Sequence, residues 1–310
     1  MRVAVVGIGG WGKNHLRVVA QLRGEGLVDT VYAVDIDETR LRWAEKVYGA
    51  QAVRGVEKAA DLDVDAAIVA TPTTLHARHA ALFLSRGVPT LVEKPFTATL
   101  GEAYELLDLG KRTLVTTGYL LRFHQGVRYV KANLSKLGRF LSAYGKRTSR
   151  WPIRPGDVGV IKDLAIHDID LVTYITGERA RAVYAAGGST RGQYEDHAQI
   201  FGQYGGSSAI FEANWLTPYK FRRIELTGDQ GIFVIDFVTD EVYFYGEDGV
   251  YRPRLEVAEP LLLQDREFLL AASGKGGEVV AVEDIVYTLK LCEAAVVSIK
   301  TGKLVGLDEV

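Results

Sequence analysis

The chain has 310 residues, enough for two domains that each bury a hydrophobic core. Its 37 Lys and Arg nearly balance its 39 Asp and Glu, for a formal net charge of -2. This balance argues against nucleic acid or an acidic membrane surface as a partner. No apolar run approaches the roughly 20 residues that cross a bilayer. The first predicted strand begins at Arg2, so we expect a cytosolic (cytoplasmic) protein without a signal peptide.

The residues prone to oxidation and deamidation are few. The single cysteine, Cys292, excludes an internal disulfide and a cysteine-based metal cluster. Met1 is the only methionine, and asparagine occurs only at Asn14, Asn133 and Asn214. Such depletion is found in thermophile proteins, so we expect a hot habitat.

A glycine-rich loop follows the first predicted strand directly. Residues 2–6 are mostly apolar and β-branched, as in a buried parallel strand, and a helical pattern runs from the loop to about residue 22. Strand, G-x-G-x-x-G and helix in this order are typical of a dinucleotide site, where the helix N-terminus faces the pyrophosphate. The residues expected to bind the cofactor here are Gly7, Ile8, Gly9, Gly10, Trp11 and Gly12.

The second predicted strand, residues 30–35, ends in an acid. Asp35 follows the last glycine of the loop by roughly 20 residues, where a carboxylate receives the ribose hydroxyls of the cofactor. Its charge would repel a 2′-phosphate, which favours NAD over NADP. Arg40 is near enough in sequence to keep NADP as an alternative. The other interpretation of Asp35 is a solvent-exposed residue at a strand end.

Strands and helices alternate up to about residue 118, which predicts a doubly wound parallel sheet and a Rossmann domain over residues 1–118. Ligands bind at the carboxyl ends of such strands, so residues there should converge with the glycine loop. Those residues are Thr71, Pro72, Glu93 and Lys94, and His76 could border the cofactor, although a solvated helix histidine is an alternative. The expected elements are helices near 38–48, 74–86 and 99–111 and strands near 65–70, 89–93 and 113–118.

The pattern changes after residue 118. Strand follows strand from Ala182 to Tyr245, with glycine-rich turns between them. We expect residues 119–310 to form a second α/β domain with a large, mainly antiparallel sheet for substrate binding and oligomerisation. Helices would cover one face of this sheet and another subunit the other, which predicts a homodimer or homotetramer. Helices are expected near 126–136, 159–170, 265–273 and 283–301.

The predicted helix 159–170 carries an acid, an imidazole and a second acid in an apolar run. If it is regular, Asp163, His167 and Asp170 share one face, because positions i, i+4 and i+7 line up. Such a trio suits proton transfer. The alternative is a buried polar cluster whose members satisfy one another.

Taken together, the glycine loop, Glu93-Lys94-Pro95 and Asp163-x-x-x-His167 resemble the glucose-fructose oxidoreductase / inositol dehydrogenase / MocA (Gfo/Idh/MocA) family over essentially the whole chain. The resemblance implies that Lys94 lies between nicotinamide and substrate, Asp163 holds a substrate hydroxyl, and His167 is the general acid/base. The chain departs from the family at residues 122–125, where Arg-Phe-His-Gln replaces the usual Arg-Phe-x-Pro. This departure affects the expected pocket wall and leaves His124 without a role.

Residues 150–170 and 214–220 more narrowly resemble the branch that oxidises the 3-hydroxyl of UDP-N-acetylglucosamine or its uronic acid. Basic residues here could meet a diphosphate, and aromatic residues could stack on uracil or a sugar ring. The alternative is a solvated charged rim with ordinary core aromatics. The expected substrate-binding residues are Arg122, Arg150, Trp151, Arg154, Asp163 and Trp215, with Arg147, Lys220, Arg222 and Arg223 also available to a diphosphate.

The resemblance therefore implies an NAD-dependent dehydrogenase that oxidises a secondary hydroxyl of a sugar. His167 would act as base, Lys94 as orienting cation, and Asp168 and Asp170 would orient His167. Alternatives are a dehydrogenase of a free polyol or monosaccharide, an NAD-retaining glycosidase or epimerase, and a non-catalytic sensor. We expect no metal, because nicotinamide chemistry needs none and no close His/Cys spacing is present, although His197 with Asp196 and His167 offers metal-binding side chains.

Overall fold

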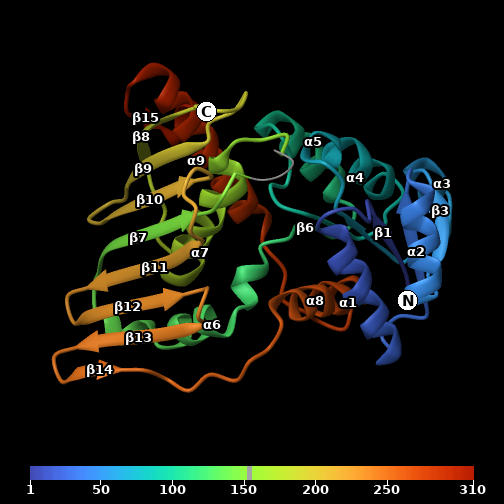
Figure 1. Ribbon diagram of the computed structural model, residues 1–310, viewed down its shortest axis with the longest axis horizontal. Coiled ribbons are helices and arrows are strands. Elements are labelled where there is room, and N and C mark those ends of the chain that lie inside the picture. The colour runs from blue at the N-terminus through green and yellow to red at the C-terminus, as the bar shows by residue number, and fades with distance from the viewer. Residues whose placement is uncertain (152–155) are drawn as a thin grey trace. The chain divides into compact units, whose positions relative to one another are not determined.

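The computed structural model describes residues 1–151 and 156–310. Contacts divide the chain into two units, Met1–Leu120 with Glu259–Val286 and Leu121–Ala258 with Tyr287–Val310 (Figure 1). Residues 259–286 thus differ from the expectation that residues 119–310 form one continuous domain. The reason is hydrophobic: Leu261, Phe268 and Leu269 join the same buried cluster as Leu16 of the first unit.

The first unit contains a six-stranded parallel sheet with the order β3-β2-β1-β4-β5-β6, which confirms the predicted Rossmann architecture. Its central strands are almost wholly buried, which explains their nearly continuous apolar sequences. The strands are β1 (Arg2–Val6), β2 (Thr30–Asp35), β3 (Gln51–Arg54), β4 (Ala66–Val69), β5 (Thr90–Val92) and β6 (Val115–Thr117). The helices are α1 (Gly12–Gly24), α2 (Glu38–Tyr48), α3 (Val56–Ala60), α4 (His76–Leu84), α5 (Leu100–Gly110) and α8 (Pro260–Ala272).

Local sequence signals set several of these boundaries. The Asp37 side chain accepts hydrogen bonds from the first turn of α2, and Gly49 ends that helix in the left-handed region. In the glycine loop, Gly7 has a φ of 83°, and a Cβ at Gly12 would lie 1.8 Å from the Gly7 carbonyl oxygen. The close approach of loop and helix therefore requires glycine at residue 12. Edge strand β3 and helix α3 were not predicted, because both are short and β3 has no fully buried residue.

The second unit contains a nine-stranded sheet with the order β14-β13-β12-β11-β7-β10-β9-β8-β15. Only the β7–β10 pair is parallel among the described strands of this sheet, which confirms the mainly antiparallel prediction. The strands are β7 (Phe140–Thr148), β8 (Ala182–Gly188), β9 (His197–Gln203), β10 (Ser208–Asn214), β11 (Phe221–Gly228), β12 (Gly231–Asp236), β13 (Glu241–Gly246), β14 (Gly249–Tyr251) and β15 (Val305–Gly306).

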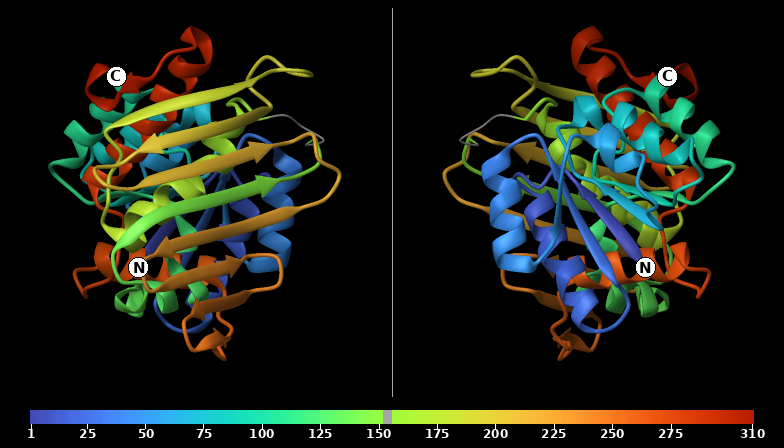
Figure 2. Two further views of the ribbon diagram at one scale, coloured as in Figure 1. Left: turned by 90° about the vertical axis from the view of Figure 1, so that its left-hand side faces the viewer. Right: turned by 90° about the vertical axis from the view of Figure 1, so that its right-hand side faces the viewer.

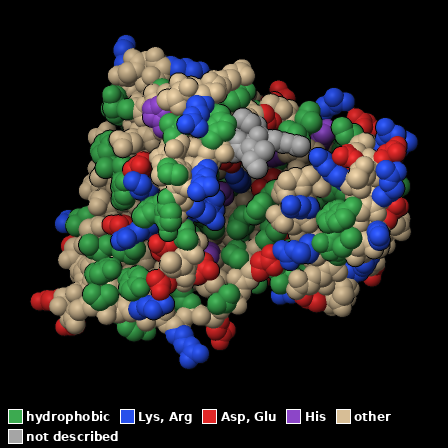
Figure 3. All heavy atoms as spheres, viewed as in Figure 1, with side chains coloured by type: hydrophobic (Ala, Val, Ile, Leu, Met, Phe, Trp, Pro, Cys, Tyr) green, Lys and Arg blue, Asp and Glu red, His purple; other side chains and the backbone are tan. Residues whose placement is uncertain are grey.

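Helices cover one face of this sheet. Burial alternates along β9 and β10, so each strand has a buried and an exposed side. Helices α6 (Gln125–Ala132), α7 (Ile166–Thr176) and α9 (Val282–Thr301) lie on the buried side. Figure 2 (left) shows the other side, over which no described helix of the second unit lies. On the molecular face in Figure 3, Lys and Arg side chains are interspersed with Asp and Glu, as the nearly balanced composition predicts.

The segment expected as one regular helix over residues 159–170 is a π-helical turn, Ile161–Ala165, followed by α7. Glu195 fixes the backbone at the start of this turn. Its carbonyl accepts a hydrogen bond from Val160 N, and its Oε1 accepts one from Ile161 N at 3.3 Å. Gly159 makes room, because a Cβ there would lie 2.1 Å from the Glu195 carboxyl carbon. The i, i+4, i+7 argument across Asp163 and Asp170 therefore does not apply, because the π-helical turn changes the spacing.

Two buried ion pairs hold α7 in the second unit. Arg147 of β7 donates from Nε and Nη2 to Asp168 Oδ1 at 2.9 and 2.7 Å, and both side chains are 1 % exposed. Arg122 donates from Nε to both carboxylate oxygens of Asp170 at 3.1 and 3.0 Å. Burial raises the pKa of Asp168, and the Arg147 guanidinium opposes that rise. Each pair ties a side chain of α7 to another element of its unit.

We predict that Asp168→Asn lowers the free energy of unfolding by about 3–5 kcal/mol, because it leaves the buried Arg147 charge without an anion. Urea unfolding followed by far-UV circular dichroism measures the change. The control is Glu241→Gln, which breaks the more exposed Arg252–Glu241 pair and should cost about 1 kcal/mol or less. Equal losses in the two variants would contradict the prediction.

Candidate active site

A cavity of about 620 Å³ lies at the carboxyl ends of β1, β2 and β4 in the first unit. This is where a doubly wound sheet binds its ligand, and the volume lies in the range of small-molecule and cofactor sites. Seven residues expected at the cofactor line the cavity: Gly7, Gly9, Gly10, Trp11, Asp35, Thr71 and Pro72. The other five, Ile8, Gly12, His76, Glu93 and Lys94, are not among the described residues of its wall.

The Asp35 carboxylate joins the glycine loop to β2. Its Oδ2 accepts from Ile8 N at 3.0 Å, and its Oδ1 accepts from the backbone N–H groups of the next two residues. Arg40 Nη1 lies 3.3 Å from Oδ2, and Arg40 also lines the cavity. Asp35 is buried, so the alternative of a solvent-exposed residue at a strand end was wrong.

Part of the cavity wall comes from residues that the sequence did not single out. Gly55, Val56 and Glu57 border the cavity from β3 and α3, and Arg78 and His79 border it from α4. Burial lowers the pKa of His79, so this half-buried imidazole is predominantly neutral at pH 7. No glycine or charge motif marks these residues, and residues 55–57 reach the cavity only because β3 pairs with β2.

His76 is buried, with 1 % of its surface exposed, so the alternative of a solvated helix histidine was wrong. Its Nδ1 lies 3.0 Å from the Pro95 carbonyl oxygen, and its Nε2 lies 2.8 Å from the Thr71 carbonyl oxygen. His76 therefore connects the loop after β4 to the loop after β5. That contact fixes the backbone beside Lys94 and beside the cavity wall.

Glu93 and His15 form a buried cluster next to Lys94. Glu93 Oε2 accepts from Lys94 N at 3.1 Å, and Glu93 Oε1 lies 3.0 Å from His15 Nε2. His15 Nδ1 lies 2.8 Å from Asp265 Oδ2 of α8. Burial by itself would lower the pKa of His15, but Asp265 and Glu93 raise it to about 10. No sequence signal links His15 to an acid 250 residues away.

In the second unit, Asp163 and His167 stand out by their exposure. Every other residue from Val158 to Thr173 is buried, and only these two are partly exposed. Asp163 Oδ2 accepts a 3.2 Å hydrogen bond from Trp215 Nε1. Trp215 is itself buried and makes an edge-to-face contact with Trp151, with ring centroids 5.9 Å apart. The π-helical turn and α7 thus present an acid and an imidazole on an otherwise closed surface.

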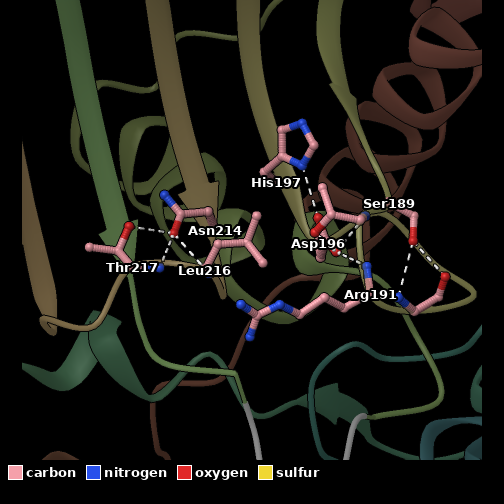
Figure 4. Close-up of polar contacts among 9 residues, drawn as sticks. Ser189, Arg191, Asp196, His197, Asn214, Leu216 and Thr217 are labelled. Carbon is pink, nitrogen blue, oxygen red and sulfur yellow. Dashed lines mark hydrogen bonds and ion pairs between the residues drawn. The ribbon is translucent and has the colours of Figure 1, made fainter.

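Two polar networks fix the backbone on either side of Trp215 (Figure 4). Asp196 accepts from His197 Nδ1 at 2.8 Å and from Thr190 and Arg191, which together outweigh burial and hold its pKa at about 2. The Asp196 carbonyl accepts from Trp215 N, and Asn214 Oδ1 accepts from the turn that follows, Leu216 and Thr217.

In the described chain, no three His, Cys, Asp or Glu side chains form a group that could hold a metal.

Four of the basic residues expected near the substrate have partners within the described chain. Arg122 and Arg147 are buried and paired with Asp170 and Asp168, so they support α7. Arg150 donates to the Pro218 carbonyl at 2.7 Å, and Arg223 pairs with Glu225. Arg154 lies outside the described residues. The two carboxylates expected to orient His167 are the same ones that the buried arginines engage.

Lys220 and Arg222 differ from these residues in their contacts. Neither side chain forms a hydrogen bond or an ion pair with another described residue. Arg222 lies opposite Arg147 in the β11–β7 ladder. Burial and the neighbouring Arg147 lower the pKa of Arg222, while Asp163 and Asp168 oppose that change. Arg222 in turn lowers the pKa of Lys220. Arg222, which Asp163 influences, and the neighbouring Lys220 form a cationic site suited to an anion.

Several known proteins are similar to this chain. UDP-N-acetylglucosamine 3-dehydrogenase of Acidithiobacillus ferrooxidans is 26% identical over 264 residues, which cover 79% of this chain and 77% of that protein. Its solved structure superposes with a TM-score of 0.87 at 24% identity, covering 97% of this chain and 98% of that one. Inositol 2-dehydrogenase of Acidiphilium cryptum is 29% identical over 182 residues, or 56% of this chain and 54% of that protein.

Family models match most of the chain. The model described as an oxidoreductase family with an NAD-binding Rossmann fold matches residues 1–119, and the GFO/IDH/MocA C-terminal domain matches residues 119–234. In the described parts of the chain, no helix combines the length and apolar character that crossing a membrane requires. The matched pair of domains, in this order, shows that the chain belongs to the Gfo/Idh/MocA family of NAD-binding oxidoreductases and is a dehydrogenase acting on CH–OH groups.

Proposed function

We propose that the chain oxidises a secondary hydroxyl of a sugar, preferably C3 of a UDP-N-acetylglucosamine-type sugar nucleotide. The observation that carries the proposal is the exposure of Asp163 and His167 in a run of residues that is otherwise buried from Val158 to Thr173. Burying a polar side chain costs free energy unless the side chain is paired. Asp163 and His167 are instead partly exposed, which leaves both accessible to a substrate.

The cavity in the first unit fits NAD. Its glycine loop begins α1, whose N-terminus suits a pyrophosphate, and the buried Asp35 carboxylate suits ribose hydroxyls. Arg40, beside Asp35, keeps NADP as an alternative. When bound, the nicotinamide supplies the acceptor for the hydride that leaves the substrate carbon.

The side chains would divide the work as follows. Neutral His167 accepts the proton of the substrate hydroxyl as the C–H hydride departs, leaving a carbonyl. Lys94, as a cation, orients that hydroxyl and stabilises the negative charge that develops on its oxygen. Asp163 accepts a hydrogen bond from an adjacent hydroxyl or from the substrate amide. Trp215 Nε1 holds the Asp163 carboxylate in place for this contact.

Lys220 and Arg222 support an anionic substrate. These two cations, which pair with no carboxylate of the described residues, would repel each other less once a diphosphate or carboxylate lies between them. The 26% identity to UDP-N-acetylglucosamine 3-dehydrogenase agrees with this preference. The second candidate is a free polyol such as an inositol, which the similarity to inositol 2-dehydrogenases favours.

We also propose a homodimer or homotetramer that uses the uncovered face of the nine-stranded sheet. Tyr184, Phe201, Ile210 and Tyr144 are exposed and lie in one row across β8, β9, β10 and β7. Such a continuous apolar row suits a second copy of the chain.

The oligomer prediction is that Phe201→Arg converts the assembly to a smaller species, because a charge in the centre of the row opposes its burial. Sedimentation velocity measures the mass. Tyr104→Arg, at an exposed tyrosine of α5, is the control and should leave the mass unchanged. A wild-type monomer would contradict the proposal.

We predict that His167→Ala and Lys94→Ala each lower kcat by about 10²–10⁴-fold, because each removes a group that acts in the transition state. NAD⁺ binding, followed by intrinsic fluorescence, should persist in both. NADH absorbance with UDP-N-acetylglucosamine or myo-inositol measures turnover. Lys111→Ala, which removes an exposed lysine paired with Asp108, is the matched control. Near-normal turnover in Lys94→Ala would overturn the assigned roles, and turnover without released NADH would favour the NAD-retaining alternative.

The substrate preference gives a separate prediction. Arg222→Met should raise KM for UDP-N-acetylglucosamine about 10-fold or more, since a charge-assisted hydrogen bond contributes ~1.5–3 kcal/mol. KM for myo-inositol, which has no anionic group, should stay the same. Arg223→Met is the control, because Arg223 points to the opposite side of β11 and pairs with Glu225. Unchanged KM for the sugar nucleotide, or turnover of free sugars alone, would reject this preference.

A further inference from the structure

A buried charged cluster lies beneath the backbone that carries Lys94. His15 comes from α1, Glu93 follows β5, and Asp265 comes from α8, so three distant segments of the first unit meet here. His15 and Asp265 are fully buried, and Glu93 is 4 % exposed. None of the catalytic roles proposed above uses His15 or Asp265.

The geometry favours a charged imidazole. Each ring nitrogen of His15 faces a carboxylate oxygen, at 2.8 Å for Asp265 and 3.0 Å for Glu93. A neutral imidazole donates from one nitrogen only, whereas the imidazolium donates from both. Burial raises the pKa of Asp265, but His15 opposes that rise, and next to two ionised carboxylates a neutral ring would place an unshared electron pair against one of them. The imidazolium offsets one of the two negative charges and lets both carboxylates stay ionised away from water.

Glu93 links His15 to the backbone of the neighbouring residue, Lys94. Its Oε1 faces His15, and its Oε2 accepts from Lys94 N at 3.1 Å. The space around it is closely fitted, because a Cβ on Gly118 would lie 2.5 Å from Glu93 Oε1. The orientation of the Glu93 carboxylate is thus fixed on both sides, and with it the backbone N–H of Lys94.

We propose that His15 is a positioning residue: as an imidazolium held by Asp265, it keeps Glu93 ionised and oriented and thereby fixes the backbone of Lys94. The inference rests on the proposed role of Lys94. Small displacements matter at such a position, since a shift of about 1 Å at a reacting group can cost 10²-fold in rate. Helix α8 reaches the cluster although it follows the second unit's strands in sequence, so Asp265 connects a late segment of the chain to the loop after β5.

The charges around His15 set its pH response. Asp265 and Glu93 raise its pKa against the effect of burial, and Asp265 also acts on Arg17 of α1, whose own partner is Glu259. Without the Asp265 charge, the effect of burial would weigh more and the pKa of His15 would fall below about 10. Raising the pH would then deprotonate His15 in a range where the wild-type residue stays charged.

The test compares His15→Gln and Asp265→Asn with the wild type. His15→Gln should lower kcat by about 10–10²-fold, with smaller changes in KM for the sugar substrate and in Kd for NAD⁺. In Asp265→Asn, kcat should fall with rising pH at a lower midpoint than in the wild type. Whichever of UDP-N-acetylglucosamine and myo-inositol supports turnover serves as the substrate. Nitrogen-15 NMR of histidine-labelled protein should show both His15 nitrogens protonated at pH 8 in the wild type and titrating in Asp265→Asn.

The control is Glu259→Gln, which removes the carboxylate of the exposed Arg17–Glu259 pair that also joins α1 to α8. Equal losses of thermal stability in Asp265→Asn and Glu259→Gln, with an unchanged kcat and pH profile, would show a purely structural role and overturn the proposal. A neutral His15 at pH 8 in the wild-type spectrum would overturn it even if the variants fail to fold. Retained turnover in Lys94→Ala contradicts the proposed function itself. An inactive Lys94→Ala beside a fully active His15→Gln rejects only the role of His15.

Discussion

The cost of burying charge constrains both units of this protein. An ionised side chain away from water is tolerated only when an opposite charge and hydrogen bonds satisfy it. Arg147 and Asp168 meet this condition in the second unit, and His15 meets it in the first through two carboxylates. Since removal of one partner leaves an uncompensated charge, each arrangement holds its elements in a single position.

In the second unit, this constraint defines the surface that α7 offers. Asp168 and Asp170 point into the protein and are held by arginines, while Asp163 and His167 stay partly exposed. The π-helical turn before α7 contributes to the difference, because it changes the spacing between Asp163 and the residues that follow. Of four polar residues within eight positions, two thus anchor the helix and two stay accessible, where we propose that the substrate binds.

In the first unit, the cavity and the Lys94 loop are joined through buried histidines. His76 connects the loop after β4, which lines the cavity, to Pro95. His15 acts on the other side of the same loop through Glu93. The cofactor cavity and the backbone of the proposed catalytic lysine therefore belong to one connected polar structure, and the folding of α8 onto α1 completes it.

The sequence by itself determined the features that depend on neighbouring residues: the glycine loop, Asp35 at a strand end, the alternating strands and helices, and the family to which Lys94, Asp163 and His167 point. Local periodicity and turn chemistry are sufficient for these. Only the tertiary structure placed α8 with the first unit, added β3 and α3 to the cavity, turned residues 161–165 into a π-helical turn, and paired Arg122 and Arg147 with α7. Those outcomes depend on partners far away in the chain, such as Asp265 for His15. Burial and pairing of charge across such distances follow from packing, which no local pattern encodes.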